Sequence, residues 1–287
     1  MAFSKTGVVS APAIVPSAFG LLAVVKPENA PGEDQWVRGF AQEWETTVQE
    51  LKNWDDTDNT NGSVVTGGVI NYYDDIKPFF IELTETRSGL SFNAIDRIAR
   101  LSRQIEGMSQ KSIETELWDG AVRKGESHDN KALSDAGTTL VNSGNALGAV
   151  LALAELERSM AAASNAGETG VIHMTSDVAS LLNTRLEKSE DGTLITRIGT
   201  PVVVGAGYSG NGPTGVTGAA ASATNKWIYG TGIVKVYLGD VDVVNDNLAQ
   251  AYDVSGNAND MRIKAIRPAA VYFDTSIHLA ARVDLTA

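Results

Sequence analysis

The sequence predicts an α+β fold with an N-terminal arm, an extended β-hairpin loop, one long helix and a body completed by late strands. Three observations predict it. One apolar stripe at helical spacing runs through residues 93–119. A polar, turn-rich stretch, 53–62, separates the early apolar segments. Short β-branched runs recur over 200–204, 233–244 and 261–285.

Residues 1–32 are expected to form an extended arm. The stretch 8–25 is apolar, as in a signal peptide, but Pro12, Pro16 and Gly20 interrupt it. It is also too short to span a bilayer, and no other segment approaches that length. The arm is therefore predicted to be neither a cleaved leader nor a membrane anchor.

Residues 33–51 fit either of two elements. The alternation of Trp36, Arg38 and Phe40 permits a strand. Apolar residues spaced four and three apart favour a short amphipathic helix instead; they are Trp36, Phe40, Trp44, Val48 and Leu51.

The polar stretch 53–62 resembles a calcium-binding loop only superficially. When Gly62 is aligned with the invariant glycine of such a loop, Gly68 falls where a bidentate Glu is needed, so no calcium site is predicted. Residues 64–66, 69–72 and 79–83 then favour strands. Because a hairpin alone is marginally stable, these strands are expected to pack against a partner.

Residues 93–119 are predicted to form the longest helix, about 40 Å at 1.5 Å per residue. Asn93 is a plausible N-cap, Asp96 and Arg100 are spaced for an ion pair, and Gly120 supplies the end. Gly107 would permit a bend or a close crossing. The apolar stripe comprises Ile95, Ile98, Leu101, Ile105, Met108, Ile113 and Leu117.

The second half of the chain alternates between short helices and strands. Residues 121–144 look irregular, and 145–163 form an Ala/Leu-rich helix that is apolar on more than one side, as in a sandwiched helix. A strand at 170–174 precedes a helix capped by Thr175 or Ser176. Later elements are a hairpin turn at Asp191–Gly192, strands at 193–196, 200–204, 227–229 and 233–244, and strands within 261–285 separated by Pro268.

Composition argues against several function classes. The chain has 287 residues, a net charge of -12 and a pI near 4.7, which does not suit a protein that grips phosphate backbones. It has no cysteine, so disulfides and thiolate metal sites are excluded. His128, His173 and His278 are scattered and are expected to be surface or strand residues. No catalytic set, metal site or cofactor is predicted.

The glycine-rich segment supports an enzyme as one alternative. It holds two overlapping dinucleotide-type patterns, Gly205-x-Gly207-x-x-Gly210 and Gly210-x-Gly212-x-x-Gly215. A nucleotide site requires a helix to begin directly after the turn, so that its N-terminus faces the pyrophosphate. Turn-forming residues follow here instead, so a nucleotide-binding enzyme using the Gly205–Gly215 loop is the less favoured hypothesis.

The order of these elements resembles the HK97-type major capsid proteins of tailed bacteriophages. Four local stretches resemble those of actinobacteriophages: 113–120 (IETELWDG), 170–175 (GVIHMT), 199–213 (GTPVVVGAGYSGNGP) and 227–232 (WIYGTG). The resemblance covers residues from about 90 onward; the first 90 residues match only in kind.

The resemblance implies a shell subunit that forms pentamers and hexamers of itself around double-stranded DNA, which it approaches without specific binding. A portal protein is an implied partner, with scaffold or cement proteins as optional ones. The virion is the implied location, after assembly in the host cytoplasm. The implied divisions are an arm (1–50), an extended loop (51–90), a peripheral domain (91–167 and 229–287, with spine helix 93–119) and an axial domain (168–228).

An encapsulin-like nanocompartment shell shares this fold and stays open as an alternative. Some relatives join a Lys to an Asn covalently, but no motif assigns such a role to Lys52, Asn53 or Lys77, so no crosslink is predicted. The glycine-rich loop is expected to pack against copies of itself near the capsomer axis. The predicted inter-subunit contacts are Trp36, Trp44, Trp54, Gly207, Tyr208, Gly210, Gly212 and Pro213.

Overall fold

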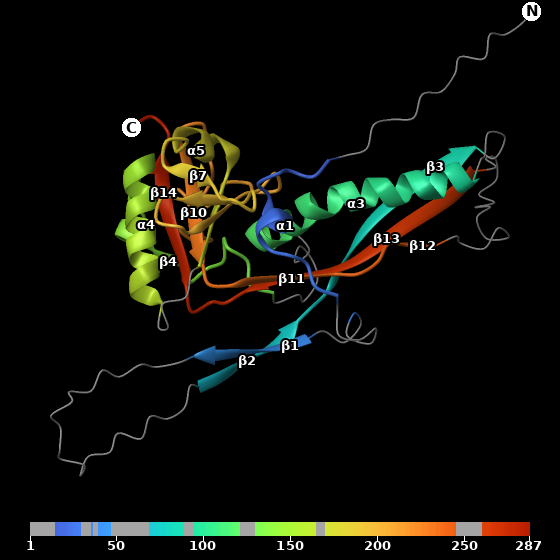
Figure 1. Cartoon of the computed structure of the whole chain (residues 1–287), viewed down its shortest axis with the longest axis horizontal. Helices are drawn as coiled ribbons and strands as arrows, with labels where there is room; N and C mark the ends of the chain where they lie inside the picture. Colours follow the sequence, from blue (N-terminus) through green and yellow to red (C-terminus); the bar gives the residue numbers. More distant parts are fainter. Residues whose placement is uncertain are drawn as a thin grey trace, which may run out of the picture.

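The computed structural model describes residues 15–29, 36, 40–46, 69–88, 94–120, 130–164, 170–244 and 260–287, and the statements below concern these residues. Several predicted features lie outside them: the turn at 53–62 with Trp54, the strand at 64–66, the Asn93 cap and His128. Figure 1 shows an elongated body with one sheet at one end and, at the other, a long helix, α3, that lies along a second sheet.

Helix α3 (Ala94–Asp119) confirms the predicted long helix. It continues unbroken through Gly107 and ends at Gly120, whose φ of 58° suits glycine. Most of the predicted stripe is buried against the neighbouring sheet, although Met108 is 40% exposed. The fully or nearly fully buried members are Leu101, Ile105, Ile113 and Leu117.

Four strands form the sheet under α3, in the order β11-β13-β12 with β3 also pairing with β13. They are β3 (Phe79–Ser88), β11 (Val234–Leu238), β12 (Asp242–Val244) and β13 (Asp260–Phe273). All pairings are antiparallel. Inward side chains of β3, β11 and β13 join the α3 stripe in one core, among them Phe79, Val236 and Ala269.

The predicted break at Pro268 is wrong, because Pro268 lies inside β13, a single strand of 14 residues. The neighbouring strand breaks instead. β11 ends at Leu238, opposite Ala269, and β12 begins at Asp242, opposite Ile266. Pro268 therefore lies opposite the gap between β11 and β12, where its missing N–H group interrupts no ladder.

An eight-stranded sheet closes the other end, in the order β4-β14-β10-β6-β9-β8-β7, with β5 pairing with β14. β6 and β9 are parallel, whereas β10 is antiparallel to both β14 and β6. The strands are β4 (Thr139–Leu140), β5 (Leu147–Gly148), β6 (Val171–Met174), β7 (Leu186–Lys188), β8 (Leu194–Thr196), β9 (Pro201–Val204), β10 (Asn225–Thr231) and β14 (His278–Asp284).

Helix α4 (Ala149–Ala163) covers one face of this sheet, with Leu153, Leu156 and Met160 buried against it. The helix begins later than predicted, because a 3₁₀ turn (Val141–Gly144) and β5 occupy the preceding residues. Its other face carries exposed Val150 and Leu151, so the described residues cover only one side of this helix, which the sequence predicts to be sandwiched. Helix α5 (Ser176–Leu181) confirms the helix predicted after β6.

The eight-stranded sheet brings together segments from the predicted peripheral and axial parts. β14, from residues 229–287, lies in the same sheet as β6, β9 and β10. Helix α4, from residues 91–167, packs on this sheet. The two units interleave along the chain. Their axial or peripheral position in a shell stays a prediction.

The early residues form two elements. β1 (Phe40–Thr46) pairs antiparallel with β2 (Val69–Ile76), so the strand alternative for 33–51 is correct over 40–46. This hairpin is a two-stranded sheet of its own, and Figure 1 shows it extending beyond the two larger sheets, of which it meets the four-stranded one at Ile76. The predicted arm is not wholly extended, because α1 (Leu21–Val24) forms one helical turn that buries Leu21 in the core.

Substitution of Gly170, which precedes β6, tests how tightly α4 and β10 pack around that strand. A Cβ there would overlap the Thr231 carbonyl oxygen and lie 2.6 Å from Met160 Cε. We expect Gly170→Ala to lower the free energy of unfolding by about 1–3 kcal/mol, because backbone on β10 cannot move aside. Urea denaturation measures this.

Gly148→Ala is the matched control, since its Cβ would meet nothing closer than 3.6 Å. Equal stability of the two variants would contradict the packing described for β6.

Candidate functional site: the glycine-rich loop and its buried anchor

The glycine-rich loop, residues 205–224, leaves β9 and returns as β10 without forming a helix. The range 170–244 is described throughout, so the helix that a nucleotide fingerprint requires does not follow Gly207 or Gly212. Within the described ranges, no group of three or more His, Asp or Glu side chains is placed to hold a metal ion. Nor does any described helix have the length and apolar character needed to cross a membrane.

Glu114 anchors the loop to α3. Its side chain is 0% exposed, and each carboxylate oxygen accepts a hydrogen bond from a different segment. Leu21 N donates to Oε1 over 2.9 Å, and Gly207 N donates to Oε2 over 2.9 Å. One carboxylate therefore joins the N-terminal segment, the long helix and the glycine-rich loop.

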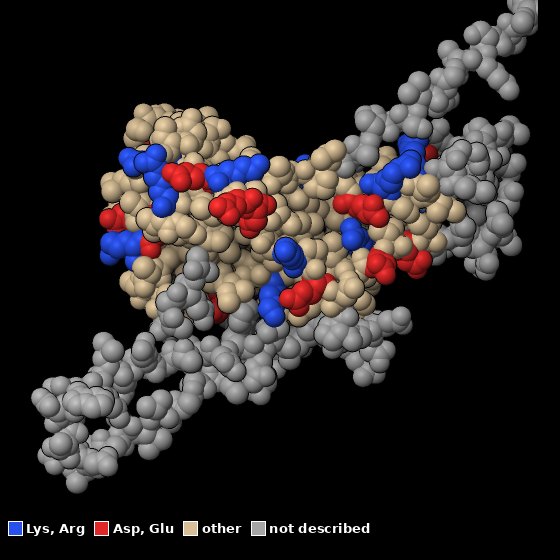
Figure 2. Space-filling model, viewed as in Figure 1, with Lys and Arg blue, Asp and Glu red and all other residues tan. Residues whose placement is uncertain are grey.

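Burial raises the pKa of the Glu114 carboxyl above its ordinary value, because water no longer stabilises the charge. Hydrogen bonds from the Leu21 and Gly207 amides act in the opposite direction, as do those from the Gln110 side chain and the Ala206 amide. Figure 2 shows that the exposed acidic and basic side chains are interspersed and form no continuous basic surface on the visible face.

Further contacts fasten the loop along the end of α3. Thr115 Oγ1 donates to Gly207 O over 3.2 Å, and Trp118 Nε1 donates to Asn211 O over 3.1 Å. Ser209 Oγ donates to Asp119 Oδ1 over 2.9 Å. Successive turns of one helix face thus hold successive loop residues.

The glycines of the loop are explained by close approach. A Cβ on Gly207 would overlap the Lys111 carbonyl oxygen of α3, and one on Gly212 would overlap the Trp227 indole. Gly210 has a φ of 77°, which favours glycine. The glycine pattern therefore serves packing against the chain's own helix and strand.

The predicted contact residues lie in different places. Tyr208, Gly210, Gly212 and Pro213 are buried by their own chain, and Gly207 is half-buried. A contact between these residues and a neighbouring subunit stays a prediction. More exposed loop residues follow, including 214, 215 and 217.

The predicted tryptophan contacts are separated from the loop. Trp36 is half-buried and packs on a small cluster beneath the four-stranded sheet that contains Ile76, Tyr237 and Tyr272. Trp44 lies in β1, but its side chain is outside the described set, as is Trp54 altogether. Their inter-subunit role stays a prediction too.

His173 is a buried strand residue that links the loop to the sheet. Its Nδ1 lies 2.8 Å from Tyr208 Oη, and its Nε2 lies 3.0 Å from Thr231 Oγ1. Burial lowers the pKa of His173 from 6.5 to about 3, so the ring is neutral at physiological pH.

Three aromatic rings complete the contact between loop, helix and sheet. Trp118 lies with its ring centroid 4.5 Å from that of Tyr208 and 4.9 Å from that of Tyr229, the latter edge-on. Tyr229 Oη also donates to Asn211 O over 2.9 Å. The loop is thus a packed part of the core at its base.

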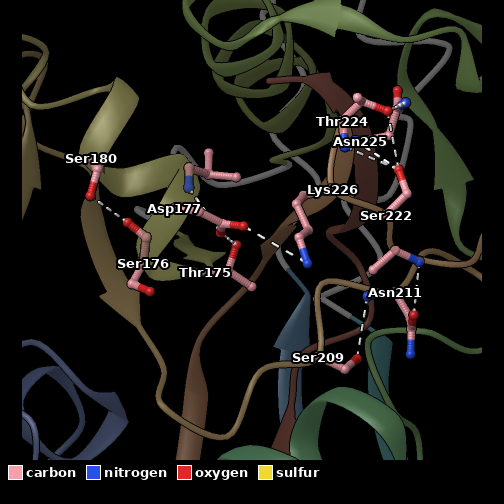
Figure 3. A network of polar contacts seen from close by, with 12 residues as sticks. Thr175, Ser176, Asp177, Ser180, Ser209, Asn211, Ser222, Thr224, Asn225 and Lys226 are labelled. Atoms are coloured by element: carbon pink, nitrogen blue, oxygen red, sulfur yellow. Dashed lines mark hydrogen bonds and ion pairs between the residues drawn. The ribbon is translucent and has the colours of Figure 1, made fainter. Parts of the chain in front are cut away.

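The outer part of the loop is held by polar contacts (Figure 3). Asn211 Oδ1 accepts a hydrogen bond from Ala221 N over 3.0 Å, and Ser222 Oγ accepts one from Asn225 N over 3.0 Å. Figure 3 shows Lys226 extending from β10 toward Asp177, whose Oδ2 lies 3.8 Å from Nζ. The loop therefore has fixed geometry out to its exposed residues.

Sequence reasoning missed Glu114 and the role of His173. The sequence does point to Glu114 and His173, because each is a polar residue within an otherwise apolar setting. Glu114 lies between Ile113 and Leu117 on the helix stripe, and His173 lies in a central strand whose residues are all buried. A polar residue in such a place requires a buried partner.

No protein-family model matches the sequence, and no curated protein matches it. The structure is similar to the capsid of an empty GTA particle computed with C5 symmetry, at 14% identity, with 98% of this chain and 94% of that chain covered and a TM-score of 0.60. The fold is that of HK97-type capsid proteins.

This fold is also similar to chains from two phages. For Mycobacterium phage Bobi the identity is 13%, the coverage is 99% of this chain and 94% of that chain, and the TM-score is 0.51. For Microbacterium phage Oxtober96 the identity is 11%, the coverage is 99% and 95%, and the TM-score is 0.51. The predicted capsid-type α+β fold is therefore confirmed across nearly the whole chain.

Gly207 tests the contact between loop and helix. We expect Gly207→Ala to lower the free energy of unfolding by about 1–3 kcal/mol and to speed amide exchange in 205–212, because a Cβ cannot fit against the α3 backbone. Ala206→Ser, at an exposed neighbour, should change stability by less than about 0.5 kcal/mol. A Gly207→Ala variant with wild-type stability and exchange would contradict the contact.

His173 makes stability depend on pH. Its folded-state pKa is depressed, so its contribution is complete above the unfolded value of 6.5 and is lost as pH falls toward about 3. We expect the loss to be about 1.4 kcal/mol per pH unit below 6.5, because the unfolded chain binds a proton that the folded chain does not.

Urea denaturation of the wild type and His173→Gln, from neutral pH to about pH 4.5, isolates this contribution from that of the other groups. At neutral pH the free energy of unfolding of His173→Gln should be lower than that of the wild type, and it should fall less steeply as the pH is lowered. Parallel stability curves for the two proteins would contradict the assignment of His173 as a buried neutral ring.

Proposed function

We propose that this chain is the major shell subunit of a phage-type capsid. In this proposal it assembles into pentamers and hexamers that close into an icosahedral head. The observation that carries the proposal is the whole-chain likeness to the capsid of a GTA particle, with 98% of this chain covered. A likeness of such extent includes the hairpin, the long helix and both sheets.

The surface of the chain supports a subunit of a larger assembly. Exposed apolar side chains recur on elements whose other faces are buried, such as Val150 and Leu151 on α4 and Phe80 on β3. The β1–β2 hairpin forms a separate two-stranded sheet that meets the four-stranded sheet through the end of β2 at Ile76, and a two-stranded hairpin is marginally stable without a partner. A ring of identical subunits buries two different faces of each copy.

The net charge is compatible with an enclosing role toward DNA. At -12, the chain repels the phosphate backbone on balance, which suits a shell that encloses double-stranded DNA without binding it tightly. A portal protein and a scaffold or cement protein are proposed partners, the virion is the proposed location, and the host cytoplasm is the proposed place of assembly. The proposed role requires no catalytic residue and no cofactor.

Assembly of the purified full-length protein tests the proposal. We expect electron microscopy and sedimentation velocity to detect closed, uniform shells as the protein concentration rises, since weak repeated contacts act together in a closed assembly. A protein that stays a compact monomer at high concentration would overturn it.

The contents of shells from the native source distinguish a capsid from a nanocompartment shell. Double-stranded DNA inside the particles supports a phage head. Particles that hold a cargo enzyme and no DNA support the encapsulin-like alternative, which shares this fold.

A further inference from the structure

The N-terminal segment, residues 15–28, crosses from one sheet to the other. Phe19 O accepts a hydrogen bond from Val204 N over 2.7 Å, at the end of β9. Farther along, Glu28 N donates to Val236 O over 2.9 Å and Glu28 O accepts from Leu238 N over 3.0 Å, both on β11. Between these points, Leu21 is 0% exposed in the core beside α3.

Glu114 is the point where this segment meets the glycine-rich loop. Its two oxygens are used by two segments, each 93 residues away in sequence from the carboxylate. Gln110, one turn earlier on α3, adds a hydrogen bond from Nε2 to Ser17 O over 3.3 Å. Figure 1 shows α1 beside the end of α3 that reaches the eight-stranded sheet.

The chemistry of this position requires a carboxylate. The Leu21 and Gly207 N–H groups donate to different oxygens, and the Gln110 side chain and the Ala206 amide also donate, so the position needs acceptors on both sides, which an ionised carboxylate offers. A glutamine amide offers one oxygen and one NH₂ group, and the latter would face an N–H donor. Displacing either segment therefore removes one of the donors that stabilise a buried charge, which weakens the hold on the other segment.

We propose that Glu114 couples docking of the N-terminal segment to the position of the glycine-rich loop, so that a subunit presents its loop for assembly only when the segment is docked. The regulatory part of this inference rests on the proposed shell function. Coupling between two sites is reciprocal, so the loop in its native position also favours the docked segment.

Gly20→Val displaces the segment at its contact with Gln110 and Glu114 and changes no residue of the loop. A Cβ at Gly20 would overlap Gln110 Nε2 and lie 2.6 Å from Glu114 Oε1. Hydrogen exchange of the unassembled full-length chain then reports on both sites. We expect Gly20→Val to speed exchange about tenfold or more in 17–25 and also in 206–212, because opening of one segment frees the other. Gly20→Ala is a milder form of the same test.

The route through Glu114 is tested by a double-mutant cycle. In a Glu114→Gln background, exchange in 206–212 should already be fast, and Gly20→Val should add little to it. Ser112→Ala, a partly exposed position on the same helix, is the matched control and should change neither region. The proposal is overturned if Gly20→Val affects only 17–25, or if its effect on the loop is as large in the Glu114→Gln background. The latter result would assign the coupling to the Phe19–Val204 hydrogen bond.

Assembly gives the second readout. Glu114→Gln should raise the concentration at which shells form by about tenfold or more, whereas Ser112→Ala should match the wild type. If the wild type and Ser112→Ala form no shells, the proposed shell function is wrong. The hydrogen-exchange data then still show whether Glu114 couples the N-terminal segment to the loop. If Glu114→Gln forms shells at the wild-type concentration although its exchange is fast, the regulatory role is wrong.

Discussion

One buried carboxylate determines how the segments of this chain are arranged. Glu114 accepts hydrogen bonds from the Leu21 and Gly207 backbone N–H groups, which lie far apart in sequence, and its side chain is 0% exposed. Burying a charge is costly unless hydrogen bonds replace its hydration, so this position is stable only when all three segments are in place. The surrounding apolar core then packs around a fixed crossing point.

The glycine-rich loop shows why a pattern of glycines has no single meaning. Glycines are needed wherever backbone approaches another group closely, and a phosphate is only one such group. Here the group approached by Gly207 is the carbonyl of Lys111, and that approached by Gly212 is an indole. The feature that separates the two cases is the next element, which is a strand here and a helix in a nucleotide site.

Local patterns predicted the elements well and their partners poorly. The stripe of α3 and the alternation in β11 and β13 are periodic within a few residues, so the long helix and the strands could be predicted. The break between β11 and β12 depends on Pro268 across the sheet, and the roles of Glu114 and His173 depend on residues 35 to 93 positions away. Such pairings arise from tertiary packing, which local propensity does not encode.

The position of β14 has a consequence for synthesis. This strand, residues 278–284, lies inside the eight-stranded sheet, between β4 and β10. When β10 has left the ribosome during synthesis, β14, which covers one edge of β10, has not yet been made. An uncovered strand edge can pair with other chains. Closure of the sheet therefore waits until residues 278–284 are made.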